Sequence, residues 1–430
     1  MGPVTLFDKS FIEMLNVDEA ALFDALFVGN ICPLYFVEVL ADLQLEDSGA
    51  RSREKVVADL AGKTPVMRAY PNVVHTTLCL AELSGHHAVE MCGRPALGGA
   101  TPVRREGKVG LYYDESREAK AFARWQQGHF QELERDFASQ WRTLLRNADH
   151  GSLARLVKST LRIHSTPRNL PDAFAIAKEV VHGSGQQFLT LKTAYTLLGL
   201  PSGDFRMIEE RWKRSGYRPV VEYAPYTAHC LLVDVFFHIA VDKGLISPTR
   251  SSNRIDLAYL YYLPFAMAFV SNDKLHRRIA PLFLTENQVF IWGQELKDDL
   301  KALDEHFSRL PRSELDRGLF HFAARPPDDD RFLTTRLWKQ LGMQMRSANS
   351  DLPPELVEAL LQEVGKLEDA ARQKVGGRFT AAEVRDAESI SIQRAVPTRR
   401  GKWRLLPPNT PPGQPLASGT APSGRPSTVK

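Results

Sequence analysis

The chain has 430 residues, of which 43% are hydrophobic and 25% charged, the composition of a soluble globular protein of two or three domains. Residues 395–430 contain six Lys or Arg and no acid, so the formal net charge of +4 leaves residues 1–394 with −2, and the overall basicity does not indicate nucleic-acid binding. The most apolar windows, 231–240 and 257–270, are interrupted by Asp234 or Pro264 and are too short to span a bilayer, so they indicate no membrane role.

The cysteines and the first residues predict the cellular compartment. Cys32, Cys79, Cys92 and Cys230 are widely spaced and form no Cys-x-x-Cys pair, which favours reduced thiols. The segment Met1–Asp8 has no basic region followed by a long apolar stretch, so we expect no signal peptide. Both observations predict a cytoplasmic protein.

The first elements of the chain are a strand and two helices. Val4–Phe7 is a β-prone run that ends at Asp8, and Ser10 is a candidate cap for the helix that follows. Residues 16–27 are predicted to be a helix because their apolar residues follow an acidic first turn. Val28–Asn30 is predicted to be a turn.

An acid lies inside the next apolar helix. Pro33 suits the first position of a helix, and residues 34–43 continue it with a strongly apolar run that contains Glu38. A carboxylate in such a helix must be paired, coordinated or in contact with water, because unpaired burial is costly.

The long middle of the chain interrupts this pattern. Residues 46–221 contain mainly helical candidates, and they have no repeat at the periods expected of solenoid proteins. We interpret this segment as a mainly helical insertion, so that residues 1–45 and 222–308 form a discontinuous core.

The core resumes with an apolar helix at 226–243, followed by a short helix that carries Asp256 in its first turn. The run Ala266–Val270 has the length of a buried strand and ends on Ser271–Asp273, where a new helix begins.

Short strands that alternate with helices predict the fold class. With a further strand at Val289–Trp292 and a helix at 294–307, the pattern indicates an α/β protein with a small parallel sheet flanked by helices. Residues 309–394 are predicted to be a helical extension. Residues 395–430, rich in Pro, Gly, Ser and Thr, are predicted to be a disordered basic tail.

Four acids are the candidate catalytic and metal-binding residues. Functional groups of a parallel sheet gather at the carboxyl ends of its strands, where the pattern places Asp8 and Asp273, and the helix start at Asp256 faces the same edge. Together with Glu38 these carboxylates would repel one another unless a cation neutralised them. Mg²⁺ or Mn²⁺ is expected, because these ions prefer oxygen ligands.

The order of these motifs resembles that of the PIN-like domain superfamily of metal-dependent nucleases. The matching segments are Leu6–Ser10, Ile31–Glu38, Asp256–Ala258 and Phe269–Asp273. The resemblance covers about residues 4–45 and 222–305; the insertion at 46–221 departs from the normally compact family pattern. It implies a metal site formed by four acids with three supporting residues: Asp8, Glu38, Asp256 and Asp273, supported by Ser10, Ser271 and Asn272.

The chemistry implied by the resemblance is phosphodiester hydrolysis, on RNA more than on DNA. One or two cations would activate a bound water and stabilise the charge that develops on the phosphate. The implied partners are RNA or single-stranded DNA as substrate; a protein partner bound through the insertion and a homo-oligomer stay open.

Each acid also has a structural explanation, and a non-catalytic interaction module that keeps the α/β core is the alternative. Asp8, Asp256 and Asp273 are each suited to the first turn or cap of a helix. Asp234 could lie beside the metal site or form a salt bridge on its helix.

Three further clusters have weaker functional interpretations. One interleaves cations with an aromatic residue, as single-strand binding surfaces do, although a solvated loop explains it as well: Arg211, Trp212, Lys213 and Arg214. In the tail, Arg399 and Arg400 would either add salt-dependent nucleic-acid affinity or keep a disordered end soluble. A zinc site would use Cys79, His86, His87 and Cys92, but their spacing matches no standard finger.

Overall fold

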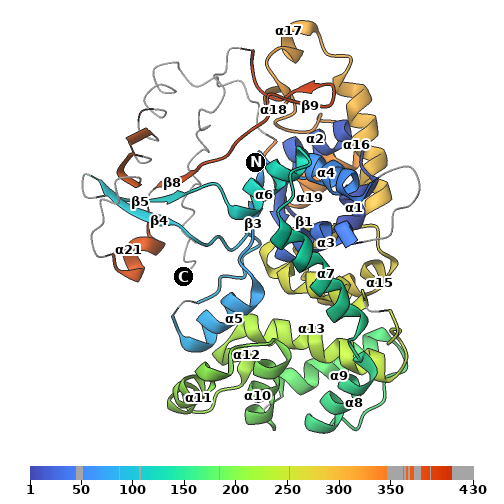
Figure 1. The fold of residues 1–430 in the computed structure, drawn as a ribbon, viewed down its shortest axis with the longest axis vertical. Coiled ribbons are helices and arrows are strands. Elements are labelled where there is room, and N and C mark those ends of the chain that lie inside the picture. Colours follow the sequence, from blue (N-terminus) through green and yellow to red (C-terminus); the bar gives the residue numbers. More distant parts are fainter. Residues whose placement is uncertain are drawn as a thin grey trace.

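The computed structural model describes most of the chain, and Figure 1 shows its fold. The described residues are 1–44, 52–86, 88–105, 108–183, 185–250, 252–345, 362, 365–366, 369–371, 379–387 and 389–408.

A five-stranded sheet in which every paired strand is parallel organises the fold, and its strand order is β3-β2-β1-β6-β7. The strands are β1 Val4–Phe7, β2 Val28–Ile31, β3 Ala69–Pro71, β6 Ala268–Ser271 and β7 Val289–Trp292. The chain adds strands on one side of β1 first and then on the other. The α/β class with a small parallel sheet flanked by helices is therefore confirmed.

The boundary between β1 and β6 is the point where the strand order reverses. Phe7 of β1 is paired with Val270 of β6, so both strands end side by side. In open parallel sheets this is where ligands bind, because the two connections leave in opposite directions and open a crevice between them.

Helices connect and cover the strands of the core (Figure 1). The helices that precede the middle segment are α1 Lys9–Met14, α2 Val17–Leu26 and α3 Pro33–Ala41. The later core helices are α13 Pro225–Asp242, α14 Asn253–Ala258, α15 Lys274–Phe283 and α16 Gly293–Phe307, with a 3₁₀ segment η3 at Tyr259–Phe265. Among these packing contacts, α2 lies against α16 and α13 against α14.

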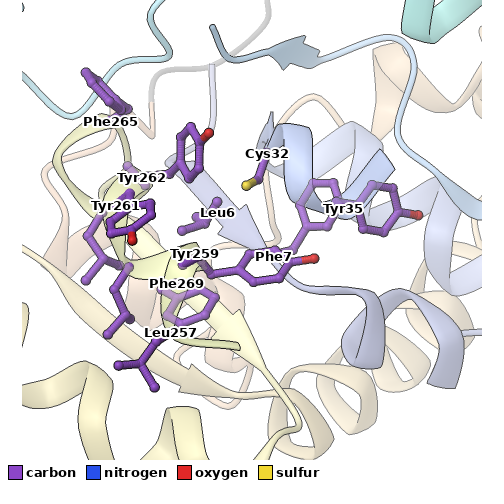
Figure 2. Close-up of a cluster of buried hydrophobic side chains, with 14 of the residues drawn as sticks. Leu6, Phe7, Cys32, Tyr35, Leu257, Tyr259, Tyr261, Tyr262, Phe265 and Phe269 are labelled. Atoms are coloured by element: carbon purple, nitrogen blue, oxygen red, sulfur yellow. The ribbon is translucent and has the colours of Figure 1, made fainter. Parts of the chain in front are cut away.

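The core beneath the reversal point is aromatic. Figure 2 shows Phe7 of β1 beside Tyr35 of α3, with Tyr259, Tyr262 and Phe269 in the same cluster. The rings of Phe7 and Tyr35 meet edge to face with centroids 5.1 Å apart. Because each fully buried aromatic side chain contributes about 1.5–3 kcal/mol, this cluster holds β1, α3 and η3 together from distant parts of the chain.

The prediction of a turn at Val28–Asn30 is wrong, because these residues form most of β2. Gly29 and Asn30 misled the prediction, yet both are required by packing. A Cβ on Gly29 would lie 3.1 Å from the Cβ of Ala69 and 3.3 Å from the ring of Phe7. The Asn30 side chain is buried and donates a hydrogen bond to the Phe265 carbonyl at 3.0 Å.

Part of the segment 46–221 belongs to the sheet rather than lying outside it. Helix α4 (Arg53–Lys63) packs on α1, and β3 pairs with β2 at the sheet edge. Pro71 hid this strand in the sequence, and an edge strand tolerates proline because one side of it needs no donor.

The remainder of this segment is mainly helical, with one hairpin. The hairpin strands are β4 Thr101–Arg105 and β5 Lys108–Tyr113. The helices are α5 His75–Ser84, α6 Arg117–Gln126, α7 Glu132–Arg146, α8 His150–Thr160, α9 Leu170–His182, α10 Gln187–Leu197, α11 Phe205–Arg214 and α12 Val220–Tyr223. In Figure 1, α8 to α12 gather below α13, and α13 packs directly on α8 and α9.

The described part of the C-terminal region contains both helices and strands. Its described elements are α17 Arg312–Leu315, α18 Leu319–Phe322, α19 Leu333–Gln340, α21 Ala381–Arg385, β8 Ser389–Ile392, β9 Arg399–Arg400 and β10 Trp403–Arg404. Strand β8 extends the hairpin sheet by pairing in parallel with β5. Much of the helical extension predicted for residues 309–394 lies outside the described residues, including all of 346–361.

The prediction of disorder from residue 395 is wrong for the start of the tail. Arg399–Arg400 pairs with Trp403–Arg404, and the Trp403 side chain is 5% exposed. The Trp403 indole donates to Asp304 of α16 at 3.0 Å. Composition did not predict this packing, because the burial of one tryptophan and one arginine fixes the segment although most of the residues around them are polar.

Candidate functional site

Asp8 and Asp273 each follow the carboxyl end of a strand, as predicted, and the structure shows that these two strands are neighbours at the reversal point. Asp8 follows β1 and caps α1, accepting the Phe11 N–H at 3.0 Å. Asp273 follows β6 and caps α15, accepting the Leu275 N–H at 2.6 Å. In each carboxylate Oδ1 accepts the hydrogen bond that caps the helix, so Oδ2 can contact other groups.

The supporting residues surround Asp8. The hydroxyls of Ser10 and Ser271 each lie 2.7 Å from Asp8 Oδ2, and Ser10 Oγ also accepts the Asn272 N–H at 3.1 Å. The side-chain oxygen of Asn272 is buried and has no hydrogen-bond partner in the described part of the chain. These contacts hold the ends of β1 and β6 in fixed register.

Asp256 lies in α14 and is 9% exposed. Its Oδ2 atom is buried and makes no hydrogen bond to any residue described. Burial raises the pKa of this carboxyl to about 6; the charge of His276 acts in the opposite direction, and Asp273 and Asp8 add to the increase. A buried carboxylate oxygen without a donor is the kind of group that a cation stabilises.

Glu38 reaches the same region from α3. Its Oε2 atom accepts a short hydrogen bond from the Tyr259 hydroxyl of η3. Burial raises the pKa of Glu38 to about 7, and the charges of Asp256 and Asp8 contribute to this rise. The prediction that this acid cannot sit unpaired in an apolar helix is therefore confirmed, since Tyr259 is its partner.

His276 is a member of the cluster that sequence reasoning missed. It is fully buried on α15, and its Nε2 atom lies 2.6 Å from the carbonyl oxygen of Asp256, so Nε2 must carry a proton. Its Nδ1 atom lies 2.7 Å from Ser271 Oγ and 3.4 Å from Asp8 Oδ2. The sequence did contain a signal for His276, since it lies three residues after the predicted cap Asp273. Residues at this spacing in a helix are neighbours on one face, so this spacing indicates that the two side chains lie close together.

His276 acts as a buried cation between the acids. Burial lowers its pKa, but the hydrogen bond and negative charge of Asp8 outweigh that effect, and the pKa rises to about 9. If Ser271 gives its only hydroxyl proton to Asp8, it must accept from Nδ1–H, so the ring carries both protons. One fixed positive charge thus offsets part of the repulsion in the cluster.

A second cation, Arg250, approaches the cluster from the loop before α14. Its Nη2 atom lies 3.3 Å from Asp273 Oδ2 and 3.9 Å from Asp256 Oδ2. On the α1 side, Lys9 is held by Asp42 at 2.8 Å, and Arg142 of α7 reaches the same carboxylate at 3.2 Å.

The four candidate acids are thus brought to one edge of the sheet from four elements. Besides burial, the charges of Asp256 and Asp8 raise the pKa of Glu38, and the charges of Asp273 and Asp8 raise the pKa of Asp256. Within the described residues no group of three or more His, Cys, Asp or Glu side chains is placed to hold a metal ion. The carboxylate oxygens instead face Tyr259, the two serines and Arg250.

The other predicted clusters lie apart from these acids. Trp212 is 2% exposed and donates to the Arg218 carbonyl at 2.7 Å, so it cannot stack on a base as a surface aromatic residue would. Arg211 binds the Leu83 carbonyl at 2.8 Å, and Lys213 pairs with Glu209 at 2.6 Å; Arg214 ends α11.

The tail arginines differ from each other. Arg399 is exposed, whereas Arg400 is 6% exposed and binds the Thr64 carbonyl at 2.8 Å and Asp24 at 3.5 Å. Arg400 is therefore a structural residue and is not available to a nucleic acid.

The structure also places residues of two other interpretations, the role of Asp234 and the zinc site. Asp234 of α13 pairs with Arg254 of α14 at 2.6 Å inside the protein, so its salt bridge joins two helices and does not lie on its own helix. Cys79 is buried and Cys92 is exposed, and His87 lies outside the described residues.

Comparison with known proteins gives no match to any family model, any curated protein or any solved structure. No helix in the described part of the chain is long and apolar enough to cross a membrane.

Proposed function

We propose that this chain is a PIN-like, metal-dependent nuclease that hydrolyses phosphodiester bonds with Mg²⁺ or Mn²⁺ held by Asp8, Glu38, Asp256 and Asp273. The observation that carries the proposal is the mutual influence of carboxylates from four separate elements near the point where the strand order reverses: Asp256 and Asp8 raise the pKa of Glu38, and Asp273 and Asp8 raise that of Asp256. Two of the four have raised pKa values, mainly because of burial, which is common where groups are arranged for chemistry.

The donor set fits a hard divalent cation. Asp256 Oδ2 is buried and receives no hydrogen bond from the described residues. Asp273 caps its helix through Oδ1, so its Oδ2 atom, which now contacts Arg250, does not take part in the cap. When bound, such a cation lowers the pKa of a coordinated water and stabilises charge on the phosphate.

The surrounding residues orient the acids. Ser10, Ser271 and the Phe11 N–H fix the carboxylate of Asp8, and Tyr259 fixes that of Glu38. His276 holds the backbone of Asp256 through the 2.6 Å contact with its carbonyl.

The proposed preference for RNA over DNA comes from the family resemblance. The helical part of the 46–221 segment would set the choice of substrate or protein partner. Residues 1–394 carry a formal charge of −2, so the attraction of a polyanion would rest on the bound cation and on local arginines rather than on net charge.

The test compares the wild type with Asp256→Asn/Asp273→Asn in Mn²⁺-dependent cleavage of labelled RNA and single-stranded DNA. The double variant is expected to lose cleavage. A matched control, Asp316→Asn/Asp330→Asn, removes the same charge from exposed acids and should retain it. Cleavage by the Asp256→Asn/Asp273→Asn variant at the wild-type rate would overturn the proposed function.

A non-catalytic interaction module is the second candidate, and two observations favour it. Asp8 and Asp273 both cap helices, and in the described ranges no three-residue group is placed to hold a metal. Thermal unfolding with and without Mn²⁺ separates the candidates. Because a ligand that binds only the folded state stabilises it, a metal site predicts a rise in Tm that is lost in Asp256→Asn, whereas the module predicts no rise.

A further inference from the structure

Arg250 lies over two of the four acids on an exposed loop. Its guanidinium is 3.3 Å from Asp273 Oδ2 and 3.9 Å from Asp256 Oδ2, while its Nε donates to Ser252 at 2.9 Å. The Arg250 side chain is 59% exposed, whereas the Asp256 side chain is 12% exposed. An exposed cation thus lies near a buried carboxylate oxygen that has no hydrogen-bond partner among the described residues.

A divalent cation and this guanidinium cannot use the same oxygens at once. Mg²⁺ binds oxygen ligands at about 2.0–2.1 Å and needs their lone pairs, and at Asp273 Oδ2 an N–H of the guanidinium already occupies one of them. Both groups are positively charged, so the binding of one disfavours the other. The Arg250 side chain is 59% exposed, so water hydrates the displaced guanidinium and limits the cost of breaking these pairs.

The position of Arg250 along the chain keeps it at the site after displacement. Ser252, two residues after Arg250, is the N-cap of α14, the helix that carries Asp256, so the backbone of Arg250 stays close to this acid. A guanidinium has a planar fork of donors that matches a phosphate group, and with its two carboxylates occupied it is left free to bind one.

We infer that Arg250 is a substrate-contacting residue: it pairs with Asp256 and Asp273 in the metal-free protein and turns to a phosphodiester phosphate when a divalent cation takes their oxygens. This inference rests on the proposed metal site and adds a residue to it. It makes two predictions, one for the binding of metal and one for the binding of phosphate.

The first measurement is Mn²⁺ affinity by calorimetry, with the full chain and no nucleic acid. Arg250→Gln removes a competing positive charge next to the acids, so it is expected to bind Mn²⁺ about three- to tenfold more tightly than the wild type. Arg277→Gln is the matched control. Arg277 is on α15, but its guanidinium lies over the Trp292 ring at 4.8 Å, so the same change in net charge should shift the affinity less than about twofold.

The second measurement is the affinity for thymidine 5′-monophosphate, which carries a phosphate but no diester to cleave, at Mn²⁺ concentrations that saturate each variant. Arg250→Gln is expected to weaken binding about tenfold, the loss of one charge-assisted contact. Arg250→Lys keeps the positive charge but lacks the paired N–H donors of the guanidinium, so its nucleotide affinity should fall less than that of Arg250→Gln.

The outcomes separate this inference from the proposed function. Equal Mn²⁺ affinity in wild type and Arg250→Gln, or equal nucleotide affinity in the two, overturns the role of Arg250 while a site that depends on Asp256 stands. Mn²⁺ binding that is absent, or unchanged in Asp256→Asn, overturns both. Arg250 is exposed, so its variants should melt at the wild-type temperature, which differential scanning calorimetry checks.

Discussion

The Ser271 hydroxyl lies 2.7 Å from the Asp8 carboxylate, although 263 residues separate the two positions in the chain. Ser271 is the last residue of β6, and Asp8 is the first residue after β1. The contact closes the two halves of the core at the point where their strand order reverses. It also links Asp8 to His276, because the same hydroxyl lies 2.7 Å from the imidazole Nδ1.

Replacement of Ser271 should destabilise the fold more than replacement of Ser10. Ser271 Oγ contacts Asp8 and His276 and accepts the Asp273 N–H at 2.9 Å, whereas Ser10 contacts Asp8 and the Asn272 N–H from a less buried position. We expect Ser271→Ala to lower the free energy of unfolding by about 2–4 kcal/mol and Ser10→Ala by about 1 kcal/mol. Urea unfolding of both variants measures the difference; equal losses would contradict it.

The pair of His276 and Asp8 should be strongly coupled in energy. Removal of either partner leaves the other as an uncompensated buried charge, so His276→Gln and Asp8→Asn should each cost about 3–5 kcal/mol. The double variant should cost clearly less than the sum of the two. A double-mutant cycle in urea measures the coupling, and strictly additive losses would show that the imidazole and the carboxylate do not interact.

His238 should make the stability fall as the pH decreases. Its ring is 2% exposed and its Nδ1 has no hydrogen-bond partner in the described structure; burial, with smaller contributions from Arg254 and His150, lowers its pKa to about 3. Below an unfolded-state pKa of about 6.5 the unfolded chain binds a proton that the folded protein excludes. This stability is fully present above that pKa and is lost as the pH falls toward 3.

The measurement compares the free energy of unfolding at pH 7 and pH 5. The contribution of His238 to the loss is about 2 kcal/mol, and His238→Leu should remove it, leaving a smaller slope from groups such as His75, whose pKa burial lowers to about 4. His164, which is exposed, provides the control, since His164→Gln should leave the slope unchanged. A slope in His238→Leu equal to that of the wild type would refute the assignment.

Arg400 should stabilise the protein although it lies in a tail of low-complexity composition. Its guanidinium is buried against Asp24 and the Thr64 carbonyl, and its loss leaves both acceptors with one donor fewer. We expect Arg400→Ala to cost about 1–3 kcal/mol and Arg399→Ala, at the exposed neighbouring position, less than about 0.5 kcal/mol. Thermal and urea unfolding test the contrast, which a similar effect of the two variants would contradict.

The sequence alone determined the elements whose signals are local. The bounds of β1 at Val4–Phe7 and β7 at Val289–Trp292 follow from short apolar runs that end in polar or helical residues. The caps at Asp8 and Asp273 follow from an acid between a strand and a helix. Such features depend on the nearest few residues, so they can be predicted without the fold.

Only the tertiary structure decided which distant residues meet. Gly29 lies in a strand because Phe7 and Ala69 pack against it, and β3 exists because β2 offers it a partner. His276 becomes a buried cation because Asp8 and Ser271 arrive from the other half of the core. A pKa or an ion pair at this edge depends on burial and on charges hundreds of residues away, and no local pattern of amino acids contains that information.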